Sequence, residues 1–455
     1  MKRLQLREKT LQEQSLINYT EVVLVKYRKQ VTIVGGGIAG FHAAIAASRS
    51  GLKTLLIEKN STIGGLTTLG LVNPFMKYWL DNQVLIKGIF QELIERLKRK
   101  GGVYFNTFDS ELMKIEMMKM LKESEVEILF KTMVTEIIKE DNKIISLKAQ
   151  SSNGEKVEIE SDFFIDASGD GIVGYLSGNE CFVGDETGKN QALTIMFTIA
   201  GVDFESVRSD VKNNPENFFA WVTPNMDVIS VAGYFKELEE AKKEDPSISI
   251  DHFFFVQLPG KGRVTVNTMN ISKDSIDNSE LSRSMLEGTI MVEKIFNFAK
   301  GYVKGFENAY LEKIAPEIGI RESRRVKGRY VFTGEDVRTY KKFPDGVVKG
   351  CYGIDIHSNE KKIDKKEKGF IPKYDDYYEI PLRSLISESY TNLAIVGRCF
   401  SSDFEGQSAA RIQPTCAGMG QAIGAGIYLA MSKNIELLKI HPNEIENQIQ
   451  KISKL

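Results

Sequence analysis

Cysteine is scarce in this chain of 455 residues, which has four: Cys181, Cys351, Cys399 and Cys416. They are scattered, and no two of them form a C-x-x-C pair. A disulfide framework, a zinc ribbon and an iron–sulfur cluster all need closely spaced cysteines, so the sequence indicates none of them. Histidine is equally rare, with 4 residues, which argues against a histidine-rich metal site. We therefore predict no bound metal.

An excess of charge of one sign is also missing, because 60 Lys and Arg balance 61 Asp and Glu. This balance gives no support to a nucleic-acid partner or a polybasic membrane contact. The longest apolar stretches, Val31–Ala47 and Cys416–Met431, are rich in Gly and Ala and shorter than the roughly 20 residues of a membrane span. We expect no membrane span and no secretory signal, and hence a cytoplasmic protein with reduced thiols.

The chain does contain short apolar runs that end in glycine. Three of them, Val31–Val34, Phe163–Ala167 and Leu393–Val396, read as buried parallel strands. Their positions predict that the first and last parts of the chain share one sheet and that the middle is an insertion. We predict an arm over 1–30, a nucleotide-binding domain over 31–185 and 381–455, and a cap or substrate domain over 186–380.

Other patterns complete the predicted α/β fold. Helical spacing or small-residue composition predicts helices near 38–50, 84–99, 111–124, 280–300 and 417–431. Residues 133–150 and 156–160, with a turn at 152–154, predict a small antiparallel meander beside the parallel sheet. The inserted cap is expected to be α+β. The lysine-rich segment 361–368 reads as a solvated loop.

Gly35, Gly37 and Gly40 form a G-x-G-x-x-G motif between a predicted strand and a predicted helix. The first glycine permits a tight turn, the second lets the backbone approach a pyrophosphate, and the third allows close helix–strand packing. Glu58 ends the next strand, about 20 residues later, where a carboxylate accepts hydrogen bonds from ribose. The unit predicts a Rossmann-like dinucleotide site but leaves open whether it binds FAD or NAD.

The segment from Val31 to Phe75 resembles the opening of FAD-dependent oxidoreductases of the glutathione-reductase-like superfamily. Further segments, in order along residues 31–431, resemble the branch related to fumarate-reductase flavoproteins and to the flavin subunit of heterodisulfide reductase. They are FFIDASGDG, EIGIRESRRVKGRYVFTGEDV, YGIDIH, YYEIPLRSLI, NLAIVGRCFSS and ARIQPTCAGMGQAIGAG. The resemblance implies FAD as the cofactor and a Rossmann-like FAD-binding domain.

The resemblance also implies a set of residues along the cofactor, from the ADP half to the flavin pyrimidine end. They are Gly35, Gly37, Ile38, Ala39, Gly40, Glu58, Lys59, Gly64, Gly65, Thr67, Val134, Ala167, Ser168, Gly169, Asp170, Gly397, Arg398, Gly420 and Gln421. Two departures stand out. Many relatives carry Gly-Asp where this chain has Gly397-Arg398, which leaves Asp403 as a substitute. The cluster cysteines of heterodisulfide reductase are also missing.

Arg321 and Arg325 form the richest cationic cluster, with Ser323 between them. In an extended chain these three side chains share one face, and arginine forks suit a carboxylate or a developing enolate. The alternative is a solvated charge run, or pairing with Glu322, Glu335 and Asp336.

Three further residue types could carry chemistry. His357, after Asp355, is a candidate general acid or base, or a hydrogen-bonded structural residue. Arg411 could bind substrate or flavin, or make a simple salt bridge. Cys399 and Cys416 could form a redox dithiol, although the 17 residues between them favour buried apolar thiols.

Together these features predict an FAD-dependent oxidoreductase that transfers a hydride between flavin N5 and a small organic substrate, a carboxylate or carbonyl compound being one option. Arg321, Arg325, His357 and Arg411 are the predicted catalytic residues. The electron donor or acceptor and a homo-oligomeric state stay open. The alternatives are an NAD-linked dehydrogenase, a non-catalytic scaffold, and a subunit of an electron-transfer complex.

Overall fold

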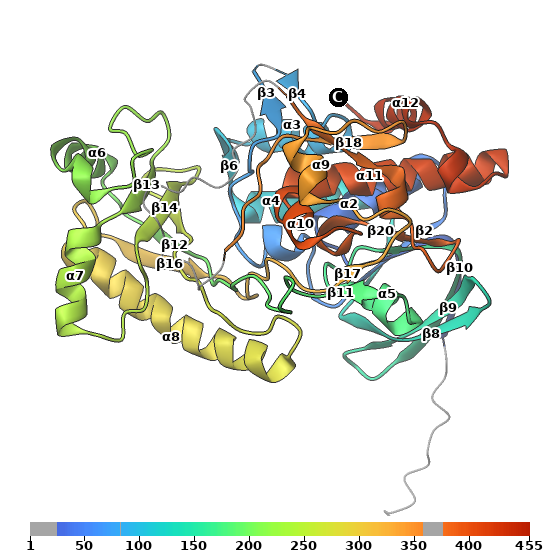
Figure 1. The fold of residues 1–455 in the computed structure, drawn as a ribbon, viewed down its shortest axis with the longest axis horizontal. Coiled ribbons are helices and arrows are strands. Elements are labelled where there is room, and N and C mark those ends of the chain that lie inside the picture. The colour runs from blue at the N-terminus through green and yellow to red at the C-terminus, as the bar shows by residue number, and fades with distance from the viewer. Residues whose placement is uncertain (1–24, 82, 358–375) are drawn as a thin grey trace, which may run out of the picture.

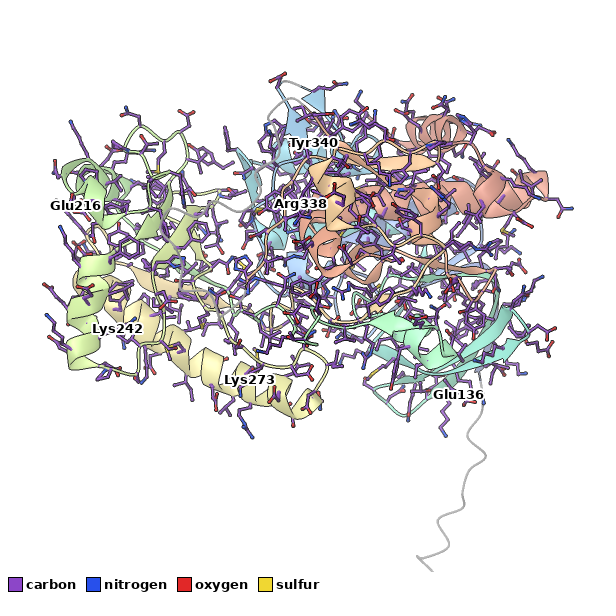
Figure 2. The ribbon with its side chains drawn as sticks, viewed as in Figure 1. Glu136, Glu216, Lys242, Lys273, Arg338 and Tyr340 are labelled. Atoms are coloured by element: carbon purple, nitrogen blue, oxygen red, sulfur yellow. The ribbon has the colours of Figure 1, made fainter. Side chains whose placement is uncertain are left out.

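The computed structural model describes residues 25–81, 83–357 and 376–455 (Figure 1). The predicted loop at 361–368 and most of the predicted arm lie outside these residues. The described chain forms two bodies (Figure 1), and the two largest of its four hydrophobic clusters lie one in each body. Charged side chains such as Glu136 and Glu216 lie exposed on the outside (Figure 2).

The first sheet has seven strands in the order β7-β2-β1-β10-β9-β8, and β20 also pairs with β10. The strands are β1 (Val25–Val34), β2 (Thr54–Glu58), β7 (Glu127–Phe130), β8 (Thr132–Glu140), β9 (Lys143–Ser151), β10 (Lys156–Asp166) and β20 (Leu393–Ile395). β7, β2, β1, β10 and β20 are parallel, whereas β8, β9 and β10 form an antiparallel meander. The predicted α/β class is thereby confirmed.

β10 differs from the prediction, because the meander strand and the glycine-ended strand are one continuous strand. Its first half pairs antiparallel with β9 and its last residues pair parallel with β20. The polar residues at the junction are accommodated by β1. Ser161 Oγ lies 2.6 Å from Thr32 Oγ1 in the interior, and Asp162 accepts a hydrogen bond from Arg28 at 2.6 Å.

The helices over the sheet centre on α2 (Ile38–Arg49) and α11 (Gln413–Lys433). A Cβ on Gly420 would lie 2.0 Å from the carbonyl oxygen of Ala39, and one on Gly424 would lie 2.4 Å from that of Ala43. The glycines therefore let the two helix backbones touch. The remaining helices of this body are α3 (Ile89–Lys98), α4 (Ser110–Glu123), α5 (Ile172–Ser177), α9 (Gly334–Arg338), α10 (Phe404–Ala410) and α12 (Pro442–Ile452).

Short elements connect these parts. The two-stranded ribbons pair β3 (Trp79–Leu80) with β4 (Gln83–Val84), β5 (Val103–Tyr104) with β6 (Thr107–Phe108), β11 (Cys181–Phe182) with β17 (Arg325–Val326), and β18 (Gly346–Gly350) with β19 (Tyr378–Pro381). The 3-10 turns are η1 (Gly65–Thr67), η2 (Pro215–Asn217), η3 (Leu382–Leu385), η4 (Gly397–Cys399) and η5 (Leu437–Lys439).

The second body is built on an antiparallel sheet in the order β13-β14-β15-β12-β16. Its elements are β12 (Phe197–Ala200), α6 (Phe204–Asn213), β13 (Ser230–Gly233), α7 (Phe235–Glu244), β14 (Phe253–Gln257), β15 (Val264–Val266), α8 (Asn278–Tyr302) and β16 (Tyr310–Ile314). Phe253 and Phe255 are fully buried and their rings contact Phe306. These two rings are core residues of this body.

The two largest hydrophobic clusters indicate which residues belong to each domain. Phe332, Val348 and Tyr378 belong to the core that contains α2. β1 already starts at Val25. We propose that the cap ends near the start of β17 rather than at 380, and that the nucleotide-binding domain starts at β1. No helix within the described residues is both long and apolar enough to cross a membrane.

Candidate functional site

A cavity lies between the carboxyl ends of the parallel strands and the second body, and its floor is the turn from β1 into α2. Gly35 adopts a φ of +102°, which favours glycine, and its N–H donates to Ile57 O at 2.8 Å. Gly37 is the N-cap of α2, has no side-chain cap, and has open space where a Cβ would stand. The free N–H groups of α2, together with the helix dipole, can therefore receive a phosphate group.

Glu58 fixes the neighbouring part of the cavity. Its Oε2 accepts from Gly36 N at 2.6 Å and its Oε1 accepts from Asn60 N at 2.8 Å. These bonds hold the carboxylate at the end of β2, where it lines the cavity. A carboxylate offers about four acceptor positions, so it can still accept from ribose hydroxyls. The glycine cradle and this carboxylate fit a dinucleotide cofactor.

Most of the residues predicted to contact the cofactor line this one cavity. They are Gly35, Gly37, Ile38, Ala39, Glu58, Lys59, Gly64, Gly65, Thr67, Ala167, Ser168, Gly169, Asp170, Gly397 and Arg398. The other four lie elsewhere. Gly40 and Gly420 pack against backbone, Val134 is buried in β8, and Gln421 donates to Lys87 O at 2.8 Å.

The start of α11 supplies two cavity residues, Ile412 and Gln413, that the sequence interpretation missed. The helix begins at Gln413, four residues before the predicted start, and Ile412, Gln413 and Cys416 line the cavity. Gln413 Nε2 donates to Val72 O at 2.6 Å, and its Oε1 is buried without a partner. Pro414 was the available signal, because proline is favoured in the first turn of a helix.

Arg398 ties the end of β10 to the last sheet strand. Its Nε donates to Gly169 O at 2.9 Å, its Nη2 to Asp170 Oδ1 at 2.6 Å, and its Nη1 to Ile320 O. Asp403, the suggested substitute for the missing aspartate, instead caps α10 by accepting from Gly406 N at 2.6 Å. It is not among the described residues that line the cavity.

Arg321 lies in the cavity wall with only 8% of its surface exposed. Its Nη1 donates to Ala192 O at 2.6 Å, and its Nη2 lies 3.5 Å from Asn267 Oδ1. Within the described part of the chain, no carboxylate lies within 4.0 Å of this guanidinium. Arg321 is therefore a buried cation held by neutral acceptors.

Asp355 contacts His357, Tyr352 and Arg411. Its Oδ1 lies 3.3 Å from His357 Nε2, and its Oδ2 accepts from the Tyr352 hydroxyl at 3.1 Å. Arg411 Nη2 donates to Asp355 O at 3.0 Å and lies 3.7 Å from Oδ2. Asp355, His357, Arg411 and Arg321 all line the cavity, so residues far apart in the sequence meet at one end of it.

Burial and mutual charge set the protonation of this cluster. Burial, with Arg411 close by, lowers the pKa of Arg321 to about 9, so the guanidinium stays protonated at neutral pH. Burial opposes ionisation of Asp355, yet His357 and the two arginines hold its pKa well below the usual range. Burial and Arg321 lower the pKa of His357, which is neutral at pH 7. At neutral pH the cluster therefore contains two cations (Arg321 and Arg411), one anion (Asp355) and one neutral imidazole (His357).

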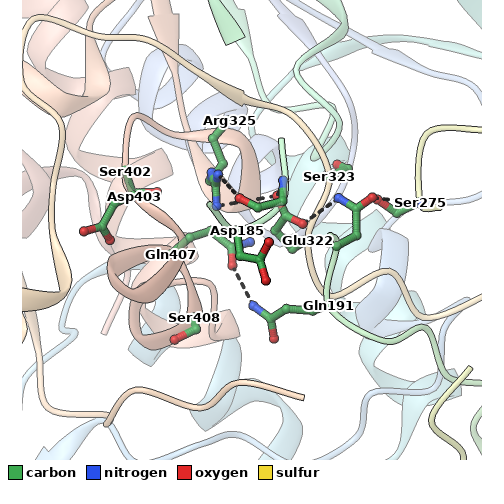
Figure 3. Close-up of polar contacts among 12 residues, drawn as sticks. Asp185, Gln191, Ser275, Glu322, Ser323, Arg325, Ser402, Asp403, Gln407 and Ser408 are labelled. Atoms are coloured by element: carbon green, nitrogen blue, oxygen red, sulfur yellow. Dashed lines mark hydrogen bonds and ion pairs between the residues drawn. The ribbon is translucent and has the colours of Figure 1, made fainter. Parts of the chain in front are cut away.

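Arg325 is not brought to this cluster. It points into the interior, where its Nη2 donates to Gly184 O at 2.7 Å and its Nη1 lies 3.5 Å from Glu322 Oε1 (Figure 3). Glu322 is fully buried and also accepts from Asn190 Nδ2 at 2.7 Å. Arg325 thus has the buried pairing that the sequence left as an alternative.

The cysteines are all free thiols. Cys416 lines the cavity and donates to Arg411 O at 3.2 Å, and burial raises its pKa to about 12. Cys399 is fully buried, and burial raises its pKa well above the ordinary value. Among the described residues, no group of three His, Cys, Asp or Glu side chains could hold a metal ion.

Residues 30–449 match the family model described as FAD dependent oxidoreductase. Curated relatives share shorter stretches. Cinnamate reductase of Clostridium sporogenes is 42% identical over 73 residues, which cover 15% of this chain and 10% of that protein. Fumarate reductase (cytochrome) of Shewanella frigidimarina is 41% identical over 86 residues, covering 19% and 14%. The matched stretches thus span only a small part of these relatives.

Solved structures to which this chain is similar include a geranylgeranyl bacteriochlorophyll reductase-like protein from Thermoplasma acidophilum. It has a TM-score of 0.45 and 13% identity, over 94% of this chain and 83% of that chain. A flavoprotein/dehydrogenase from Cytophaga hutchinsonii has a TM-score of 0.42 and 15% identity, over 93% and 83%.

Proposed function

The chain belongs to the FAD-dependent oxidoreductase family, and from this premise we propose that it transfers a hydride between FAD and a small organic substrate. The substrate would bind at the end of the cavity that holds Arg321, Asp355, His357 and Arg411. The observation that carries the proposal is that the glycine cradle and this titratable cluster line the same cavity. A hydride acceptor and a proton-handling group must both reach one substrate.

The residues at the cradle end would hold the cofactor. Gly35 and Gly37 would take the pyrophosphate with the N-terminus of α2, and Glu58 would take the adenosine ribose. The N-terminus of α11, at Gln413, would face the other end of the cofactor. When bound, FAD supplies a two-electron centre that accepts or donates a hydride.

His357 would move the proton that accompanies the hydride. In the dehydrogenation direction, the neutral imidazole would take the proton that the substrate loses, and bound FAD would supply the acceptor for the hydride. In the reduction direction, the protonated imidazole would return that proton and the reduced cofactor would supply the hydride, so atoms and electrons would balance in both. Asp355, 3.3 Å from His357 Nε2, would orient the ring and stabilise its charged form.

The electron donor or acceptor that completes the cycle is part of the same proposal. The match of residues 30–449 to a family of FAD enzymes favours an FAD-dependent oxidoreductase over an NAD-linked dehydrogenase and over a non-catalytic scaffold. The finer branch, with fumarate-reductase flavoproteins, is supported by the 41% identity over 86 residues. If a partner chain reoxidises the flavin, we expect that chain to co-purify with this protein.

The test uses the flavin spectrum of the FAD-loaded protein. Candidate reductants are screened anaerobically for bleaching of the oxidised flavin, and candidate acceptors for its return. The test variant is His357→Gln, and His441→Gln, at an exposed histidine, is its matched control. We expect both variants to keep FAD and only His357→Gln to slow substrate-linked bleaching, by about 100-fold or more. Equal rates in all three proteins would contradict the assignment of His357.

A further inference from the structure

We propose that the substrate of this site is a small monocarboxylate with an apolar body, whose carboxylate is bound by Arg321 and Arg411. This proposal rests on the hydride-transfer function above, and it adds the charge and shape of the substrate. Three observations carry it: the charge balance of the cluster, the unused donors of the two arginines, and the apolar residues beside them.

The charge balance separates these two arginines from the other buried ones. Arg325 has the buried carboxylate of Glu322, and Arg398 has Asp170 at 2.6 Å. Among the described residues at the reacting end of the cavity, Asp355 is the one carboxylate within 4.0 Å of Arg411, and none lies within 4.0 Å of Arg321. One guanidinium is therefore left without a counter-ion in a site of low dielectric, where an unpaired charge is costly. A single anionic group on the ligand restores neutrality.

The other charged cavity residues do not change this balance, because they lie along the cofactor cradle or have partners. Asp170 is paired with Arg398, and Glu58 accepts two backbone hydrogen bonds beside the cradle. Lys59 and Glu317 also line the cavity, one as a cation and one as an anion, so together they leave the balance of charge unchanged. His357, the remaining titratable group, is neutral at pH 7 because burial and Arg321 lower its pKa.

The two guanidinium groups still have donors to offer. An arginine has five N–H donors in a planar fork. Arg321 uses Nη1 on Ala192 O and holds Nη2 at a long 3.5 Å from Asn267 Oδ1. Arg411 uses Nη2 on Asp355 O, and its Nε is buried with no partner. A planar carboxylate matches such forks and would give the unpartnered Nε an acceptor.

Apolar and polar side chains share the cavity lining with these arginines: Val72, Met196 and Ile412 are apolar, and Thr194, Asn267 and Gln413 are polar. Ile412 adjoins Arg411, and Val72 is held beside them by the bond from Gln413 Nε2 to its carbonyl oxygen. A second carboxylate placed against Val72, Met196 or Ile412 would lose its hydration without gaining a hydrogen-bond donor from them. The lining therefore favours an apolar body over a dicarboxylate.

The test compares three six-carbon probes on the FAD-loaded wild-type protein: hexanoate, its neutral amide hexanamide, and the dicarboxylate adipate. Binding is read from the shift of the flavin spectrum and from the rise in melting temperature. We expect hexanoate to bind at least about tenfold more tightly than either of the others. Equal binding of hexanamide, tighter binding of adipate, or no binding of hexanoate to a protein that retains FAD would overturn the proposal.

The second arm uses Arg321→Gln, with the exposed Arg283→Gln on α8 as the matched control. We expect Arg321→Gln to retain FAD and to bind hexanoate no better than hexanamide, whereas Arg283→Gln keeps the preference. Loss of FAD from Arg321→Gln would assign this arginine to the cofactor and overturn the proposal. Failure of the wild type to bind FAD would instead contradict the proposed function, so the two failures are distinguishable. If Arg321→Gln does not fold, the wild-type series decides alone.

Discussion

The Asp355 carboxylate and the His357 imidazole face each other in the cavity, with 3.3 Å between Oδ1 and Nε2. The Tyr352 hydroxyl donates to the other carboxylate oxygen at 3.1 Å. The carboxylate favours the protonated imidazole, while burial and Arg321 disfavour it. Asp355 is thus a positioning residue that partly offsets the fall in the pKa of His357.

Asp355→Asn tests that relationship. Removing the carboxylate takes away the contribution that raises the pKa of His357, so this pKa falls further. For dehydrogenation, which needs the neutral imidazole, the acid limb of the kcat/KM profile is expected to move to lower pH. The plateau is expected to fall by about 10- to 100-fold because the ring is no longer oriented. Exposed Asp141→Asn serves as the control, and an unchanged profile in Asp355→Asn would refute the role.

His42 predicts an acid-dependent loss of stability. It is fully buried in α2, with Nδ1 2.7 Å from Ile38 O, and burial lowers its pKa from 6.5 to about 4. As the pH falls, the imidazole of His42 takes up a proton in the unfolded chain before it does so in the folded protein. The free energy of unfolding therefore falls by about 3 kcal/mol as the pH drops from 6.5 towards 4. His42→Gln should lack this part of the fall in urea denaturation measured across that range. Parallel curves for the wild type and the variant would contradict the prediction.

Gly420→Ala tests the contact between α2 and α11. The new Cβ would stand 2.0 Å from Ala39 O, so a helix must shift, at a cost of about 1–3 kcal/mol. Gly301→Ala is the matched control, because it lies in α8 with nothing within 4 Å of the new Cβ. Because alanine has a higher helix propensity than glycine, the free energy of unfolding of Gly301→Ala should equal or exceed that of the wild type. Urea unfolding of both variants measures the difference, and equal stability would argue against the tight contact.

The cysteines are expected to react slowly in the folded protein. Burial raises the pKa of Cys416 to about 12, and only the thiolate is nucleophilic. Mass spectrometry after brief iodoacetamide treatment should show little labelling of Cys399 and Cys416 in the folded protein and full labelling in urea. Rapid labelling, or a disulfide between the two after mild oxidation, would favour the redox-dithiol alternative.

The fold was predictable where its signals are local. The β-α-β unit is marked by short apolar strands and by glycines that only a tight turn needs, and the structure has it at β1, α2 and β2. The continuity of β10 was not predictable, because Ser161 and Asp162 look like a polar break. Their partners, Thr32 and Arg28, lie on β1 more than 100 residues away.

The site, too, was predictable only where its signals are local in the sequence. Strand alternation predicted that Arg321 and Arg325 share a face, but β17 starts only at Arg325, and Arg321 lines the cavity whereas Arg325 donates to Gly184 O in the interior. Asp355 carries no local pattern, and its place beside Arg411 depends on packing between distant segments. The cofactor cradle is encoded by backbone geometry, whereas the reacting end is assembled by tertiary contacts.

The central claim is that one cavity is divided into a cofactor end and a substrate end, and FAD titration of the apoprotein tests it most directly. Gly37→Val would fill the open cradle, where a Cβ meets no protein atom, while Arg321→Gln alters only the far end. We predict that Gly37→Val keeps the apoprotein melting temperature and loses FAD affinity by at least about tenfold. Arg321→Gln should bind FAD as the wild type does. Wild-type FAD affinity in Gly37→Val, or its loss in Arg321→Gln, would contradict this division.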